Sequence, residues 1–405
     1  MDYISRYSIF SDSYSKLCIG AGITIVFLLF LLSAYSPIVS LYLSLIILCS
    51  SIRYNSALRF SISINIIFTI AVVCASRSIY MARNDDFLGV YLPLFQYISH
   101  GGGMFYSDFS GGVEFFLPLL FKILFLVGVS GKVGIIFSFV FIVLFLFYIW
   151  IELFLKNIYK VTDKTIVIAS ILGFVFFAVL SQQMRQVLST VFILYFLYYY
   201  LMKKKVLSFS WLLLAAVTHL SAIPVSILLI AMVSKKPYKY VLTVILFLFT
   251  WLFAGVLTFL ISSNYLGVAA YKLNYYLYNK DMSFSSYLYY CPIFIMYCFF
   301  YKIKNNMSSE IIKNLMLFSS LFYLILLPIP LASDRVLMFS VLFLKGLYIY
   351  FVFQNYLSLY RIALIMFFCF KIITIWNVVP SVENGISSFW GDYPPAGDTM
   401  FYYFD

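Results

Sequence analysis

Besides a lysine triplet in a turn, two isolated ionisable side chains interrupt the apolar sequence of residues 181–229. Arg185, followed by Gln186, opens an apolar helix, and His219 breaks the next apolar run. Ionisable groups at membrane depth are costly and usually face a bundle interior or a watery cavity. A guanidinium can bind a phosphate through paired hydrogen bonds without losing its proton, and an imidazole can take a proton or donate a hydrogen bond. These residue types indicate phosphate binding beside a proton acceptor.

Each of these residues also has a structural explanation. Arg185 could reach toward the membrane interface, and with Gln186 it could form a hydrogen bond between helices. His219 could be a satisfied histidine that bonds neighbouring backbone at a helix break. The residues alone leave both interpretations open.

The longest segment that does not span the membrane, residues 77–124, carries further candidates. An acidic residue stands five positions before a tyrosine, a spacing that brings both side chains to one end of a short helix. The adjacent Asp85 could take the place of this acid. A glutamate follows shortly before an aromatic residue. The candidates in this segment are Arg77, Asp86, Tyr91 and Glu114.

The pair Asp334–Arg335 lies at a turn between two late apolar runs and offers a second arginine at the depth of Arg185. It is either a local ion pair that closes the turn or part of a substrate site. Lys345 and Lys371 lie in the middle of predicted spans, where pairing within the bundle and a functional role are equally open.

The composition defines the elements that must position these residues. The chain has 405 residues, of which 64% are hydrophobic and 10% charged, and its mean hydropathy is +1.01. Apolar runs of about 18 residues recur from end to end, the length that a bilayer about 30 Å thick requires of a helix. We expect an all-α integral membrane protein: a single polytopic helical bundle over residues 1–405, with about 12–14 transmembrane helices.

The spans are predicted from the apolar runs, and lysine and arginine clusters between them set the orientation. We expect spans at 17–35, 38–52, 60–76, 134–155, 165–182, 186–202, 206–218, 221–233, 239–262, 284–302, 313–331, 335–353 and 360–378. With the basic clusters inside, the N-terminus is inside and the C-terminus outside. This requires residues 115–129 to dip in and return. The outer parts are then 77–133, with re-entrant or interfacial helices, 264–283, and the tail 379–405.

The net charge of +12 does not indicate nucleic acid, because the basic residues form short clusters between apolar runs. The six cysteines are scattered without a C-x-x-C spacing, so we expect neither disulfides nor a cysteine metal site. Two histidines without a carboxylate–histidine cluster also argue against a catalytic metal. No cofactor is expected.

The order of these features resembles the Wzy-type polysaccharide polymerases of the EpsG kind. The shared features are Arg185–Gln186 followed by an apolar helix, a basic turn and His219 before Ser-Ala, together with an arginine at a span end, the acid–tyrosine pair, the glutamate before an aromatic residue and a late arginine. The resemblance is best over residues about 70–230. It implies a GT-C-like membrane glycosyltransferase that polymerises oligosaccharide repeat units carried on undecaprenyl pyrophosphate, at the periplasmic face of the bacterial inner membrane. A chain-length regulator is implied as a further partner.

In such a reaction Arg185, Arg335 and Arg77 would stabilise the leaving pyrophosphate, with Gln186, Tyr91 and Asp334 lining the same site. The base would be His219, Glu114 or Asp86, which the sequence does not rank. Two alternatives remain: a flippase of lipid-linked oligosaccharide, expected to show an internal repeat, and a glycan ligase, expected to have a larger late external loop than 264–283.

Overall fold

The computed structural model describes residues 20, 22–50, 56–76, 86–159, 161, 163–175, 177–234, 237–262, 284–301, 307–326, 335–377 and 396–404. After a helix over Gly22–Tyr35, the main helices are α2 (Pro37–Cys49), α3 (Ser56–Ala75), α6 (Gly131–Phe154), α7 (Lys164–Gly173), α8 (Phe177–Gln182), α9 (Met184–Leu201), α10 (Lys205–Thr218), α11 (Ala222–Val233), α12 (Tyr238–Ser262), α14 (Phe284–Tyr301), α15 (Met307–Leu326), α17 (Lys345–Phe353) and α18 (Leu357–Asn377).

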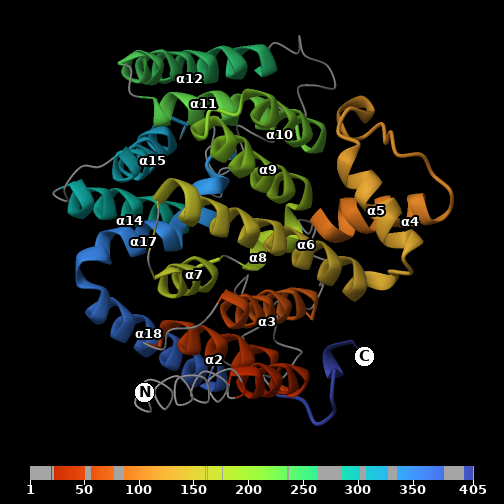
Figure 1. The fold of residues 1–405 in the computed structure, drawn as a ribbon. Coiled ribbons are helices and arrows are strands. Elements are labelled where there is room, and N and C mark those ends of the chain that lie inside the picture. The colour runs from red at the N-terminus through yellow and green to blue at the C-terminus, as the bar shows by residue number, and fades with distance from the viewer. Residues whose placement is uncertain are drawn as a thin grey trace, which may run out of the picture.

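The long helices lie side by side, and most run in the same general direction across the molecule (Figure 1). Helices α2 and α3 pack with each other, α3 packs on α6, and α9 packs closely against α10. The shorter α4 (Leu92–Ser99) and α5 (Phe116–Leu126) form a lobe at one end of the bundle. The lobe belongs to the segment predicted to lie outside the spans.

The prediction of an all-α polytopic membrane protein is confirmed. By length and composition, four helical stretches in the described part of the chain can cross a membrane: Ser56–Ala75, Gly131–Tyr159, Ser309–Leu326 and Phe339–Ile373. Shorter apolar helices, α10 and α11 among them, accompany these four. Helix α5 has 11 residues, or about 16 Å, which is too short to cross a bilayer about 30 Å thick.

The predicted span 165–182 is wrong as a single helix, because it is divided into α7 and α8. Helix α7 ends at Gly173, where an added Cβ would lie 2.5 Å from the ring of Phe368. Gly346 of α17 approaches the backbone of α7 even more closely, since its Cβ would lie 2.2 Å from the Ser170 carbonyl. This tight packing depends on helices that are distant in the chain. The sequence gives no sign of the break, because the apolar run continues through it.

Polar contacts between helices fix the bundle from within. The Asn65 amide donates to the hydroxyls of Ser40 (3.0 Å) and Ser44 (2.9 Å), which ties α3 to α2. The Trp150 indole donates to the Leu194 carbonyl (2.7 Å) and joins α6 to α9. Where hydrocarbon gives no hydrophobic drive between helices, such bonds and close packing select the neighbours.

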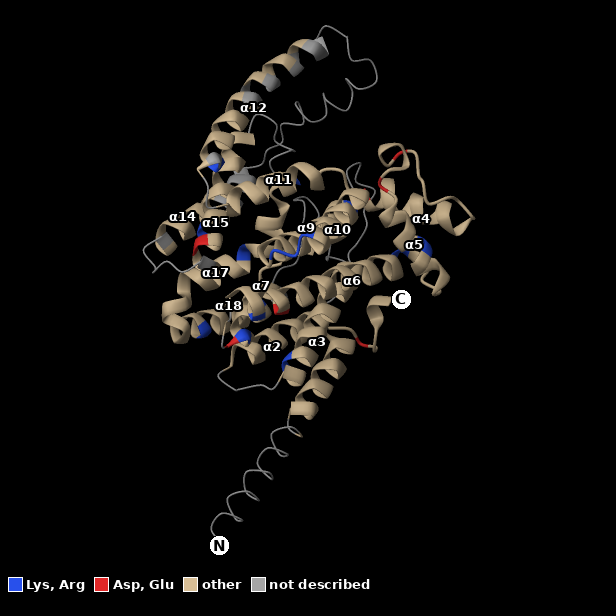
Figure 2. Ribbon diagram, turned by 45° about the horizontal axis from the view of Figure 1, so that its top comes forward, with Lys and Arg blue, Asp and Glu red and all other residues tan. Residues whose placement is uncertain are grey.

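The charged residues in the described part of the chain are few and gather in groups (Figure 2). Glu152 on α6 accepts from Arg59 on α3 (2.9 Å) and from Lys164 at the start of α7 (3.1 Å). Asp163 pairs with Arg361 on α18. Arg59, Lys164 and Arg361 belong to the clusters predicted on the inner side, and these ion pairs bring their helices together.

Candidate active site: a carboxylate between arginine and histidine

Helices α9 and α10 form an antiparallel hairpin that determines where Arg185 and His219 lie. The Ser189 hydroxyl of α9 donates to the Ala215 carbonyl of α10 (2.9 Å). Arg185 lies four residues before Ser189, and His219 lies four residues after Ala215, which is about one helical turn in each helix. The same register therefore puts Arg185 opposite His219. The two ionisable residues, 34 positions apart in the chain, therefore lie at the same end of the bundle.

His219 ends α10 in an extended conformation (φ −158°, ψ 123°), and α11 begins at Ala222. The interruption releases the backbone N–H of Leu220 from the helical hydrogen-bond pattern. That N–H donates to a carboxylate oxygen of Glu114 at 2.9 Å, and His219 Nδ1 lies 2.8 Å from the same oxygen. His219 thus lies at a break between two helices, and its ring contacts the charged side chain of Glu114.

Glu114 is the centre of the site. Its side chain is 1% exposed, and its other oxygen accepts from Arg185 Nη1 at 2.5 Å. The carboxylate therefore bridges Arg185 and His219, and both oxygens are occupied. Buried charges are stable when they are paired and hydrogen-bonded in this way.

The loop before Glu114 supplies a second contact to Arg185. Phe109 is buried, and its ring centroid lies 3.8 Å from the guanidinium carbon of Arg185. The Phe109 carbonyl accepts from the backbone N–H of Glu114 at 3.4 Å. The turn between them needs glycine, since Gly111 and Gly112 have φ of 68° and 89°. A cation over an aromatic face gains strength when water is excluded.

Tyr91 approaches the site from the other side of the lobe. Its hydroxyl accepts from the Arg185 backbone N–H at 3.5 Å. Burial raises the pKa of this phenol, the Arg185 cation lowers it in part, and the charge of Asp86 raises it. Asp86 directly precedes the π-helical turn Phe87–Tyr91, which leads into α4, and among the described residues its side chain makes no capping bond to that turn. Asp86 and Tyr91 thus lie at the two ends of one helical turn, and their joint role in a site stays a prediction.

The electrostatics keep Glu114 ionised. Burial by itself raises the pKa of the carboxyl, but the hydrogen bond and charge of His219, the Leu220 N–H and the Arg185 cation outweigh it. Together they lower the pKa of Glu114 to about 2. At physiological pH the carboxylate is a permanent acceptor.

A late helical segment joins the site through Gln186, whose amide donates to the backbone carbonyl of Arg335. Arg335 begins the segment that leads through the π-helical turn Phe339–Leu344 into α17. Of the predicted site residues, the structure brings together Tyr91, Glu114, Arg185, Gln186, His219 and the backbone of Arg335. Asp86 lies one helical turn from Tyr91. Arg77, Asp334 and the alternative Asp85 lie outside the described residues.

Two further contacts of the site, the ring of Phe109 and the backbone N–H of Leu220, were not predicted from the sequence. Neither carries a signal, because one is among 45 phenylalanines and the other is a backbone group. In the described part of the chain, no group of three or more histidine, cysteine, aspartate or glutamate side chains could hold a metal ion.

The fold and these contacts define a multi-pass membrane protein whose buried polar cluster joins an arginine, a carboxylate and a histidine at one end of the helices. The EpsG family model matches residues 82–389. The chain belongs to this family of Wzy-like polysaccharide polymerase-type proteins. The membership supports a polysaccharide polymerase-like role in exopolysaccharide or O-antigen biosynthesis. No curated protein and no solved structure matches the chain significantly.

Proposed function

We propose that the protein polymerises lipid-linked oligosaccharide repeat units. It would transfer a growing glycan from undecaprenyl pyrophosphate to the non-reducing end of another undecaprenyl-pyrophosphate-linked repeat unit, at the periplasmic face of the inner membrane. The observation that carries the proposal is the bridge from Arg185 through Glu114 to His219. It unites a phosphate-binding group and an oriented proton acceptor, the two requirements of this transfer, in one GT-C-like membrane site.

His219 is the favoured base. Glu114 is held ionised by three donors, and with its pKa at about 2 it is too weak a base to take a sugar proton near neutral pH. It acts instead by accepting from Nδ1 of His219, which fixes the tautomer and leaves Nε2 as the nitrogen that takes the proton. The imidazolium that forms is stabilised by the same carboxylate, as in other histidine–carboxylate pairs.

The arginines act on the leaving group. As the acceptor oxygen forms its bond to the anomeric carbon, the bond from that carbon to the pyrophosphate breaks and negative charge moves to the phosphate. Arg185 directs Nη1 to Glu114 and has Nε and Nη2 for other acceptors. The backbone of Arg335 is bound by Gln186, the residue after Arg185, which makes Arg335 the second candidate, and Arg77 is a third. A displacement that uses a single base inverts the anomeric centre.

A glycan ladder on a gel tests the proposal. A deletion strain is complemented with wild type, His219→Ala, Glu114→Gln or Asp108→Asn. The last is a matched control, since Asp108 is an exposed acid on the same loop as Glu114. We expect the His219 and Glu114 variants to be expressed but to leave a single attached repeat unit, because loss of a general base lowers a rate by about 10²–10⁴-fold. Asp108→Asn should restore the ladder.

Two other outcomes would contradict polymerisation. Loss of every attached repeat unit in the deletion strain would indicate a flippase or a ligase, since both act on the presence of glycan rather than on its length. A normal ladder without the protein would exclude a role in polymer formation. A chain-length regulator as a partner would appear as a change in the modal ladder length when both proteins are expressed.

A further inference from the structure

A second group of polar atoms lies at the break between α8 and α9. Ser181 Oγ, Gln183 Oε1 and Arg185 Nε are all buried and have no hydrogen-bond partner in the described part of the chain. They fall within five consecutive residues, and Ser181 is fully buried. A buried polar group without a partner costs about 1–3 kcal/mol, so three neighbouring ones are an unusual feature of an apolar bundle.

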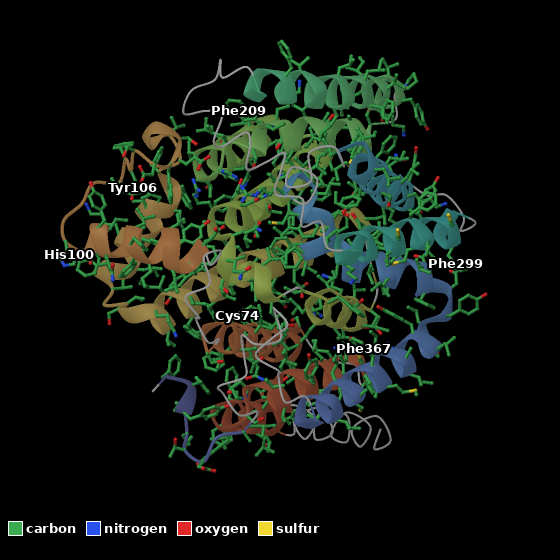
Figure 3. The ribbon with its side chains drawn as sticks, turned by 180° about the vertical axis from the view of Figure 1, so that it is seen from behind. Cys74, His100, Tyr106, Phe209, Phe299 and Phe367 are labelled. Atoms are coloured by element: carbon green, nitrogen blue, oxygen red, sulfur yellow. The ribbon has the colours of Figure 1, made fainter. Side chains whose placement is uncertain are left out.

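The backbone changes direction at this break but keeps its hydrogen bonds: the Gln183 N–H donates to the Val179 carbonyl (3.1 Å), and the Gln183 carbonyl accepts from the Val187 N–H (2.9 Å). Gln183 precedes α9 in a non-helical conformation (φ −114°, ψ 51°), and within the described residues its side chain makes no capping bond to α9. The preceding helix is held from the other side, where Cys74 contacts the Phe177 carbonyl at 3.7 Å; Cys74 is labelled near the middle of the bundle in Figure 3. The break is thus held in place by its neighbours, and the groups at this break without a partner among the described residues are side-chain atoms of Ser181, Gln183 and Arg185.

The types of the three atoms discriminate between ligands. Gln183 Oε1 can only accept a hydrogen bond, Arg185 Nε can only donate one, and Ser181 Oγ can do both. A phosphate oxygen offers acceptors alone and would leave the glutamine oxygen unsatisfied. Sugar hydroxyls donate and accept, so neighbouring hydroxyls of one ring can satisfy the whole set.

We propose that the α8–α9 break is a sugar subsite, formed by Ser181 and Gln183, for the sugar that is attached directly to the pyrophosphate of the donor. This rests on the proposed function. Arg185 belongs both to this set and to the Glu114–His219 cluster, so a sugar in the break lies beside the group that contacts the phosphate. Ser181 and Gln183 then contribute to the choice of the first sugar.

Binding to the purified protein in nanodiscs tests the subsite with two probes: sugar-free undecaprenyl pyrophosphate, and the lipid-linked repeat unit extracted from a polymerase-deletion strain. We expect Ser181→Ala and Gln183→Leu to bind the repeat unit about tenfold more weakly, as the loss of one buried hydrogen bond predicts. Both variants should bind sugar-free undecaprenyl pyrophosphate as the wild type does. An equal loss of affinity for both probes would indicate that the break binds phosphate. Unchanged affinity for both probes would indicate a packing defect without a ligand. Either result would overturn the proposal.

Thermal stability provides the matched control. Ser208→Ala removes a buried serine whose hydroxyl donates to the Phe196 carbonyl at 3.3 Å, far along the hairpin from the break. It should lower the melting temperature and keep repeat-unit binding. Ser181→Ala removes a hydroxyl that has no partner, so it should keep or raise the melting temperature and lose binding. A fall in melting temperature for Ser181→Ala with binding unchanged would assign the serine a structural role instead.

The two proposals can fail separately. Polymerisation is tested by His219→Ala in the glycan ladder, and the result does not depend on Ser181 or Gln183. A ladder that needs His219, together with unchanged probe binding in the Ser181 and Gln183 variants, would retain the polymerase and reject the subsite.

Discussion

Glu114 joins three segments that are far apart in the chain: its own loop, the start of α9 and the interruption after α10. One carboxylate accepts from Arg185, from His219 and from the Leu220 N–H. Removing one member of a buried pair is costly, since it leaves an uncompensated charge. The same carboxylate therefore stabilises this end of the bundle and orients the ring of His219.

This double role gives the protein a stability that depends on pH. Folding lowers the pKa of Glu114 from an ordinary 4.5 to about 2, so the ionised form is favoured in the folded state. The stability it contributes is fully present above about pH 4.5 and is lost as the pH falls toward about 2. We expect the melting temperature of the wild type to fall more steeply than that of Glu114→Gln between these values. Parallel melting curves in detergent would show that Glu114 is not held in this way.

We predict that Arg185 does not tolerate replacement by lysine. A lysine ammonium could still pair with Glu114, but it lacks the planar fork that leaves Nε and Nη2 for a ligand. We expect Arg185→Lys to keep the fold and to polymerise about a hundredfold more slowly, the usual effect of removing one preorganised donor. Initial rates on purified lipid-linked repeat units measure this. Wild-type rates in the variant would restrict Arg185 to its ion pair.

At the scale of elements, the α9–α10 hairpin sets the distance between Arg185 and His219. Besides the bond from Ser189 to Ala215, the rings of Tyr195 and Trp211 stack with centroids 4.4 Å apart. These contacts hold the register that brings His219 opposite Arg185. The hairpin is therefore expected to tolerate changes in its turn and not in its helices.

Two insertions test this. One alanine inserted after Leu212, inside α10, turns the rest of the helix by about 100° and advances it by about 1.5 Å, which moves His219 away from Glu114. One alanine inserted after Lys203, in the turn, leaves both helices intact. We expect the first insertion to abolish the glycan ladder and the second to preserve it. A ladder from the α10 insertion would show that the register does not position the histidine.

The sequence predicted the helices and the ionisable residues better than the way the chain assembles them. Arg185, His219 and Glu114 stood out because ionisable groups rarely occur between apolar runs. Their mutual contacts depend on the path of the lobe, on left-handed glycines at 111 and 112 and on the ring of Phe109, none of which has a periodic signal. The division of the predicted span 165–182 into two helices could not be predicted either. Hydropathy indicates which residues are apolar, but it does not indicate that Gly346 packs closely against the backbone of α7.

At the scale of the whole molecule, two polar clusters lie toward opposite ends of the helices. The site cluster lies where α9 begins. Near the other end of α9, Tyr198 accepts from Asn157 at 2.6 Å, in the stretch just after Glu152. From Arg185 to Tyr198 the helix advances about 20 Å. The Glu152 and Asp163 pairs lie at the end that the positive-inside rule predicts to face the cytoplasm, so we expect the Glu114 cluster to lie at the opposite face.

Cysteine labelling tests this orientation. In a variant without the six natural cysteines, His100→Cys lies on the exposed lobe, where Figure 3 labels His100, and Lys204→Cys lies in the α9–α10 turn. Helix α9 has 18 residues, or about 27 Å, so we expect the turn and the site end to lie near opposite faces of the bilayer. We expect a membrane-impermeant maleimide to label His100→Cys in intact spheroplasts, and Lys204→Cys only after permeabilisation. The reverse pattern would put the Glu114 cluster on the cytoplasmic side, where lipid-linked units are found before they are flipped, and would contradict transfer at the outer face.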